Sequence, residues 1–311
     1  MACKDRVWEV PEPLSVHRIR MDDGTVIHLR QHGNPNGPRL VLSHGNGLAI
    51  DLYYPFWSLL AQDFELFVFD LRNHGWNAVG AQADHIVPAL VDDHDRILDE
   101  IDVRYGKKPK IGIFHSVSAL ASLVSSTGNC DFAARILFDP PLCKPNDYPE
   151  EYDIATRRST EAALRRTDTF KSLDEFVDLL SWLPVYHRTV PGVLDLAART
   201  MLKKNDGGDG YSLRCPRTYE AQIINYARMY TVWVDLEEID CPTKVVGADP
   251  VLPYSYLPTF DLSQIHSLDY DFLPDTTHLL QLEQPKECVA VIREFLEQHN
   301  LLDNRKVHIG Q

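Results

Sequence analysis

The chain has 311 residues, 44% hydrophobic and 10% aromatic, which predicts a packed globular core rather than disorder. Its formal net charge of −14 argues against nucleic acid as a partner, because phosphates need a basic face. Six scattered cysteines without a C-x-x-C pair argue against a disulfide framework and against a metal site. The start of the chain lacks a signal-peptide core, and no apolar run reaches the roughly 18 to 20 residues of a membrane span. We therefore expect a cytoplasmic protein; the sequence does not decide between a monomer and a homodimer.

The first segments of the chain have the character of strands. Turn residues at 22–24 and 34–38 separate three apolar or alternating runs, so the first two runs predict a hairpin. The expected strands are 14–21, 25–33 and 39–45.

Helical and strand patterns alternate in the next hundred residues. Helical spacing of apolar residues predicts helices, and short continuous apolar runs predict buried strands. The expected helices are 51–63, 85–106 and 117–126, and the expected strands are 64–72, 109–116 and 134–141. Such alternation predicts an α/β fold with a mostly parallel sheet flanked by helices.

An insertion interrupts this alternation. Residues 143–236 contain several helix-like segments and no strong strand pattern, so we expect a helical cap without a sheet of its own. Strands at 243–250 and 268–275 and a helix at 286–299 then complete the fold. The expected division is an α/β core of residues 1–142 and 237–311, with a cap (lid) of residues 143–236.

Three residues that follow expected strands form a candidate catalytic set: Ser116, Asp249 and His278. Open α/β sheets place their sites at strand ends. A Ser hydroxyl becomes a nucleophile when a neutral imidazole takes its proton, and a carboxylate orients that imidazole. Taken alone, Ser116 would be read as a helix N-cap. Asp139, at the preceding strand end, is the alternative acid.

The same chemistry needs donors for an oxyanion. The turn from strand to helix at Ser116 would direct the Val117 N–H to the site, and the loop 44–47 would add the Asn46 N–H. We expect His44 and His115 to have structural roles.

Four stretches resemble the α/β-hydrolase family: SHGNG at 43–47, FVFDLRNHGWN at 67–77, HSVSA at 115–119 and THLLQLEQPKECVAVIREFL at 277–296. They occur in the family's order across nearly the whole chain. The order Ser, Asp, His is also that of the family. The chain departs from the G-x-S-x-G elbow at Phe114, and Asn73 replaces a usual glycine whose positive φ it can tolerate.

The resemblance implies a serine hydrolase without cofactor or metal that cleaves a carboxylic ester, lactone or thioester of a small, largely apolar substrate. A C–C bond hydrolase with the same residues and a slow-turnover receptor of the strigolactone and karrikin type are the alternatives. We expect four cap arginines, Arg157, Arg158, Arg165 and Arg166, to face solvent. The expected pocket residues are Gly45, Trp76, His115, Trp182, Tyr186 and Leu252.

Overall fold

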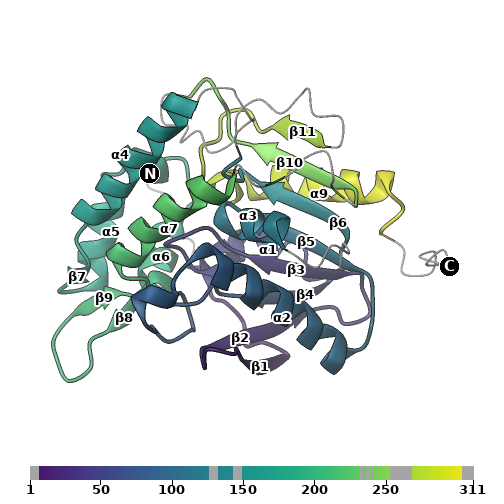
Figure 1. Cartoon of the computed structure of the whole chain (residues 1–311), viewed down its shortest axis with the longest axis horizontal. Helices are drawn as coiled ribbons and strands as arrows, with labels where there is room; N and C mark the ends of the chain where they lie inside the picture. Colours follow the sequence, from purple (N-terminus) through teal and green to yellow (C-terminus); the bar gives the residue numbers. More distant parts are fainter. Residues whose placement is uncertain are drawn as a thin grey trace.

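The computed structural model describes residues 7–125, 132–142, 149–231, 234, 239, 241–252 and 268–302. An eight-stranded sheet runs through the middle of the molecule, with helices on both faces (Figure 1). In spatial order its strands are β1 (Ser15–Arg20), β2 (Val26–Gly33), β4 (Glu65–Phe69), β3 (Arg39–Ser43), β5 (Lys110–His115), β6 (Phe132–Phe138), β10 (Thr243–Gly247) and β11 (Asp269–Phe272).

Only β2 breaks the parallel arrangement, because it pairs antiparallel with both β1 and β4. The β1–β2 hairpin turns at Gly24, whose φ of 85° suits glycine. From β4 to β11 all the pairings are parallel. The prediction of a mostly parallel α/β sheet is therefore confirmed.

The parallel strands are buried on both faces, and their side chains alternate between two apolar layers. Leu40 and Leu42 of β3 belong to the layer under α1 (Tyr54–Trp57) and α9 (Pro285–Gln298). Val41, between them, belongs to the layer under α2 (Val87–Tyr105) and α3 (Val117–Val124). This two-sided burial explains why these strands are continuous apolar runs in the sequence.

The helix expected at 51–63 is wrong in its extent. The structure has a 3₁₀ turn, η1 (Ile50–Tyr53), followed by the four residues of α1. Pro55 lies at the start of α1, where its missing N–H costs nothing, but it cannot continue a helix that began before it. The helix α2, in contrast, ends as predicted at Gly106, with a φ of 79°.

Four longer helices between β6 and β10 lie beside one end of the sheet, at the left of Figure 1: α4 (Pro149–Arg165), α5 (Leu173–Ser181), α6 (Val193–Met201) and α7 (Arg217–Thr231). The short elements of the chain are η2 (Gln82–Asp84), η3 (Pro184–Tyr186) and α8 (Leu280–Glu283). No helix in the described ranges is long and apolar enough to cross a bilayer.

The expectation that the insertion has no sheet is wrong. Three short strands, β7 (Thr169–Phe170), β8 (Leu202–Lys204) and β9 (Tyr211–Leu213), pair antiparallel in the order β7-β9-β8. Strands of two or three residues are too short to leave a period of two in the sequence. The division of the chain at residues 143 and 236 stays a prediction.

Phe114, the residue that departs from the elbow pattern, points into the core. Its ring is fully buried and makes edge contacts with His94 and Phe132 at centroid distances of 5.1 and 5.7 Å. The ring lies over Gly112, where a Cβ would come within 2.6 Å of Phe114 Cε2. A glycine two residues earlier in β5 thus makes the room for Phe114.

We predict that Gly112→Ala lowers the free energy of unfolding by about 1–3 kcal/mol, because the added methyl group overpacks the core beneath Phe114. Urea unfolding followed by circular dichroism measures the change. Gly80→Ala is the matched control, since its Cβ would meet only Asn73 Oδ1 at 3.6 Å. In a Phe114→Leu background the Gly112→Ala cost should shrink; an equal cost in both backgrounds would contradict the explanation.

Candidate active site

Ser116 stands in a sharp turn between β5 and α3. Its φ of 55° and ψ of −122° lie outside the regions that non-glycine residues normally adopt. The Ser116 N–H donates to Phe138 O of the neighbouring strand at 2.9 Å, and Leu120 N–H donates to Ser116 O at 3.1 Å. This turn has the form of a nucleophile elbow, and the neighbouring strand and the first turn of α3 hold it from both sides.

Ser118, where the elbow pattern has glycine, closes the turn from inside. Its hydroxyl donates to His115 O at 2.8 Å and accepts from His115 N–H at 3.1 Å. The side chain is buried, so these bonds satisfy both the hydroxyl and the backbone of the turn. A small polar residue therefore replaces the glycine here.

His278 has a carboxylate partner, and it is Asp139. His278 Nδ1 lies 2.6 Å from Asp139 Oδ2, and Asp139 follows β6 with a φ of 40°. The other oxygen of Asp139 accepts from Ala248 N–H at 3.2 Å. Because one ring nitrogen makes one strong hydrogen bond, Asp139 occupies the position expected for Asp249.

Asp249 organises the loop that carries His278. Its two carboxylate oxygens accept from Val251 N–H at 3.0 Å and from Asp275 N–H at 2.8 Å. The expectation that Asp249 is the partner of His278 Nδ1 is wrong, and the reason is spatial. Since β6 and β10 are neighbours in the sheet, both carboxylates lie at adjacent strand ends.

A second carboxylate, that of Glu283, also holds the loop that carries His278. Thr277 donates its N–H and its hydroxyl to the carboxylate of Glu283, at 2.6 and 2.5 Å. Glu283 belongs to the Glu-x-Pro stretch that resembles the family. The threonine in place of the usual glycine before His278 therefore adds an anchor.

The ring of His278 lies beside the elbow. Its centroid is 4.6 Å from that of His115, the residue that precedes Ser116. His115 Nε2 lies 2.8 Å from His278 O. The structure thus brings Ser116, His278 and Asp139 to one edge of the sheet.

The loop after β3 passes close to Ser116. A Cβ on Gly45 would come within 3.2 Å of Ser116 Cβ and 2.6 Å of His115 Nδ1, so only glycine fits there. In the described chain, neither Asn46 N–H nor Val117 N–H donates to a protein acceptor. The N–H groups of the two expected oxyanion donors therefore have no protein acceptor among the described residues.

Two neutral histidines support this loop from below. His44 Nδ1 donates to Gly45 O at 2.7 Å while its Nε2 accepts from Leu71 N–H at 3.1 Å. His74 Nε2 accepts from Gly47 N–H at 2.9 Å. Burial, followed by the nearby His44 and His85, holds the pKa of His74 well below its usual value, so the imidazole stays an acceptor for Gly47.

The expected pocket residues differ in their burial. Gly45 and His115 adjoin Ser116, Tyr186 of η3 is buried, and Leu252 is partly buried after β10. Trp182 does not join them, because its side chain is 82% exposed at the end of α5.

Trp76, whose side chain is 42% exposed, contacts a buried ion cluster from the solvent side. Its Nε1 donates to Asp51 at 2.8 Å, and its ring lies 4.4 Å from the Arg30 guanidinium carbon. Arg30 is fully buried and also donates to Asp70 at 2.8 Å. Asp70 in turn accepts from the N–H groups of Ile50 and Trp76, which fixes the backbone beside the loop after β3.

Two polar residues of the stretch 143–236 that no sequence pattern pointed to lie near the loop after β3: Glu220 contacts it, and Arg166 contacts Glu220. The Glu220 carboxyl lies where a Gly47 Cβ would be, and Asn46 Nδ2 donates to Glu220 O at 2.8 Å. Arg166 forms an ion pair with Glu220 and is largely shielded, so the expectation that it faces solvent is wrong; Arg165 is 80% exposed, as expected. Because the Arg166–Glu220 pair is neutral overall, it adds no net charge beside the loop after β3.

His74, His85 and Cys215 bring their potential ligand atoms within 4.8 Å of one another. The hydrogen bonds of this cluster do not suit a metal ion. His74 uses both nitrogens, and His85 Nδ1 accepts from Asn73 Nδ2 at 2.9 Å, which leaves the proton on Nε2. Burial raises the pKa of the Cys215 thiol well above its usual value, whereas metal binding needs the thiolate.

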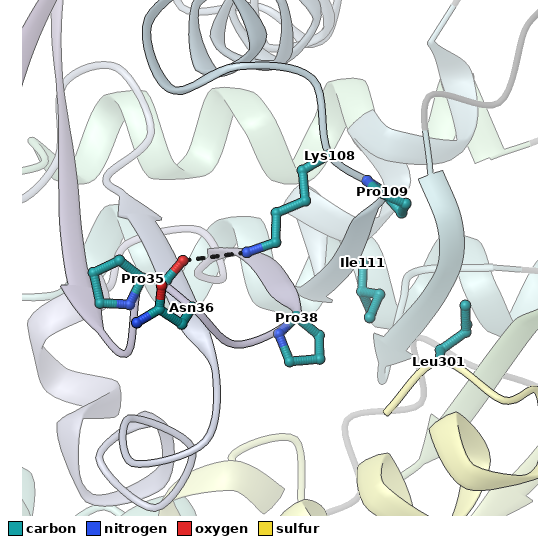
Figure 2. Close-up of a pocket in the computed structure, with 7 residues that line it drawn as sticks. All are labelled: Pro35, Asn36, Pro38, Lys108, Pro109, Ile111 and Leu301. Atoms are coloured by element: carbon teal, nitrogen blue, oxygen red, sulfur yellow. Dashed lines mark hydrogen bonds between the residues drawn. The ribbon is translucent and has the colours of Figure 1, made fainter. Parts of the chain in front are cut away.

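A hollow of about 320 Å³ lies at the opposite end of β5 (Figure 2). Lys108, two residues before β5, lines it and donates to Pro35 O and to Glu65. A six-residue strand spans about 20 Å, so this hollow is remote from Ser116. It is not part of the candidate active site.

Comparisons with known proteins identify the family and the fold. Residues 40–291 match the model of the alpha/beta hydrolase family. An E-2-(acetamidomethylene)succinate hydrolase has a similar structure, with a TM-score of 0.72 and 17% identity over 91% of this chain and 99% of that chain. The thioesterase domain from the curacin biosynthetic pathway has a TM-score of 0.68 and 18% identity over 90% of this chain and 99% of that chain.

An esterase from Thermogutta terrifontis is similar with a TM-score of 0.64 and 20% identity, over 92% of this chain and 99% of that chain. No curated protein sequence matches the chain significantly. At these identities the solved structures establish the shared fold alone. With the family model covering most of its length, the chain belongs to the alpha/beta hydrolase family.

Proposed function

We propose that the chain is a serine hydrolase that cleaves a carboxylic ester, lactone or thioester through an acyl-enzyme. Ser116 is the nucleophile, His278 the base and Asp139 the acid that orients His278. One observation carries the proposal: Ser116 stands in an elbow turn at the sheet edge where His278 and Asp139 lie 2.6 Å apart. Isolated polar residues rarely combine a disfavoured backbone conformation with such a pair outside a functional site.

The reaction follows from the geometry. His278 Nε2 takes the Ser116 proton as Oγ attacks the carbonyl carbon, and Asp139 holds Nδ1–H and stabilises the imidazolium. The oxyanion accepts from Asn46 N–H and Val117 N–H. His278 then protonates the leaving alcohol or thiol, and a water activated by His278 releases the acid from Ser116.

The substrate we propose is small, largely apolar and without net charge. Tyr186 of η3 is buried, and the ion pair of Arg166 and Glu220 beside Gly47 has no net charge. A hydrolase fold usually acts on a small molecule in a pocket that excludes water. We also propose a cytoplasmic location, because in the described part of the chain the buried Cys215 and Cys288 form no disulfide.

We predict that a fluorophosphonate probe labels the wild-type protein and that Ser116→Ala abolishes the labelling. The substitution should also lower kcat on short p-nitrophenyl esters by about 10⁴-fold or more, because the nucleophile is lost. Gel fluorescence and a chromogenic assay measure the two effects. Ser122→Ala, a buried serine in α3 that donates to Ala119 O, is the matched control and should behave as wild type. Equal labelling of Ser116→Ala would overturn the proposal.

We predict that Asp139→Asn lowers kcat by about 10³- to 10⁴-fold, because the amide cannot hold His278 in the required tautomer. Asp249→Asn should keep kcat within about tenfold of wild type, since Asp249 accepts from the backbone N–H groups of Val251 and Asp275 while Asp139 holds His278 Nδ1. Steady-state kinetics on the same ester provide the comparison, with thermal melting to verify folding. The reverse ranking of the two variants would assign the acid to Asp249.

A further inference from the structure

We infer that Tyr53 and His115 form a buried positioning relay that aligns the oxyanion loop and the base with Ser116. The inference rests on the proposed function. Neither residue is assigned a chemical step: Tyr53 acts through Gly45, and His115 acts through His278. Tyr53 lies in η1, outside the family-like stretches, and its side chain is fully buried.

Three hydrogen bonds make up the relay. Gly45 N lies 3.3 Å from Tyr53 Oη, Tyr53 Oη lies 2.6 Å from His115 Nδ1, and His115 Nε2 lies 2.8 Å from His278 O. The path therefore runs from the loop after β3, through the residue beside the nucleophile, to the main chain of the base.

The chemistry of the groups leaves one direction for these bonds. Gly45 N–H can only donate, so Tyr53 Oη accepts there; the His278 carbonyl can only accept, so His115 Nε2 carries the proton. A neutral imidazole with Nε2–H has its lone pair on Nδ1, and Tyr53 O–H donates to it. All the donors point the same way along the path, an arrangement in which each bond strengthens the next.

Both side chains stay neutral in the ordinary pH range. Burial, followed by the nearby His278, holds the pKa of His115 well below its usual value. Burial raises the pKa of Tyr53, and Tyr186 adds to that effect. His44 is a further titratable group near His115, and burial lowers its pKa as well. The direction of the three hydrogen bonds therefore stays the same across the ordinary pH range.

In the relay, the His115 ring contacts two separate parts of the site, the Gly45 backbone and the His278 main chain. The Gly45 backbone is packed so closely on His115 Nδ1 that a Cβ would lie 2.6 Å away, so the position of the Asn46 N–H follows from this contact. The His278 main chain is fixed by the opposite ring nitrogen. Because a misplacement of about 1 Å can cost about 100-fold in rate, loss of the relay should impair catalysis more than binding.

The test is Tyr53→Phe, which removes one hydroxyl and keeps the ring. We expect kcat on a p-nitrophenyl ester to fall about 10- to 100-fold with KM changed less than about twofold, and fluorophosphonate labelling to slow in parallel. Tyr54→Phe, the same change one residue later, is the matched control; its ring packs on Trp8 and Trp57, and wild-type kinetics are expected.

A double-mutant cycle with His115→Gln separates a relay from two independent packing effects. If the relay exists, Tyr53→Phe adds less than about a twofold loss in the His115→Gln background. Additive losses, a wild-type kcat in Tyr53→Phe, or a loss confined to KM would overturn the inference. Thermal melting and active-site titration normalise each rate to folded protein.

Nitrogen NMR of ¹⁵N-histidine-labelled protein supplies a readout that does not need turnover. It should show neutral His115 with the proton on Nε2, and a proton on Nδ1 would contradict the relay. Absence of Ser116-dependent labelling in the wild type would defeat the proposed function; the NMR result would still decide the hydrogen-bond pattern. Labelled wild type with unaffected Tyr53→Phe would defeat the relay alone.

Discussion

The backbone conformation of Ser116 is the constraint on which the rest of the site depends. A non-glycine residue at φ 55° and ψ −122° costs about 1–3 kcal/mol, so the surroundings must hold it there. The bond to Phe138 O ties the turn to β6, and Ser118 closes it from within. The turn also leaves the Val117 N–H at the start of α3. It also brings Gly45 so close that no side chain fits on that residue.

Buried polar groups, each with a defined partner, transmit this constraint through the site. His44 and His74 support the loop after β3 as neutral hydrogen-bond partners, and burial keeps their pKa values low. Arg30, paired with Asp51 and Asp70, fixes the neighbouring backbone. Removing one partner of such a buried pair leaves an uncompensated charge and is strongly destabilising. The low dielectric of the interior makes an unpaired polar group costly, and it also strengthens the hydrogen bonds of a complete network, which makes the network rigid.

Asp139 and Asp249 have the same chemistry, and their places in the sheet determine which of them contacts His278. Asp139 and Asp249 end neighbouring parallel strands, so either could in principle reach the loop after β11. The positive φ of Asp139 turns its carboxylate toward His278 Nδ1, whereas backbone N–H groups at Val251 and Asp275 occupy the two oxygens of Asp249. Spacing along the chain contains no information on this competition, because both residues follow apolar strands of similar length.

The sequence by itself determined the order of strands and helices, the family, and the positions of Ser116 and His278, because apolar periodicity and turn residues are local signals. It missed the small sheet of the cap, whose strands are too short for a period. It could not find Tyr53, which lies in an apolar segment without a motif, or place Trp182 on the surface. Only the tertiary structure decided which aspartate contacts His278 Nδ1, the direction of Phe114, and the contact of Glu220 with the loop after β3. These depend on side chains far apart in the sequence, whose meeting is set by strand register and packing.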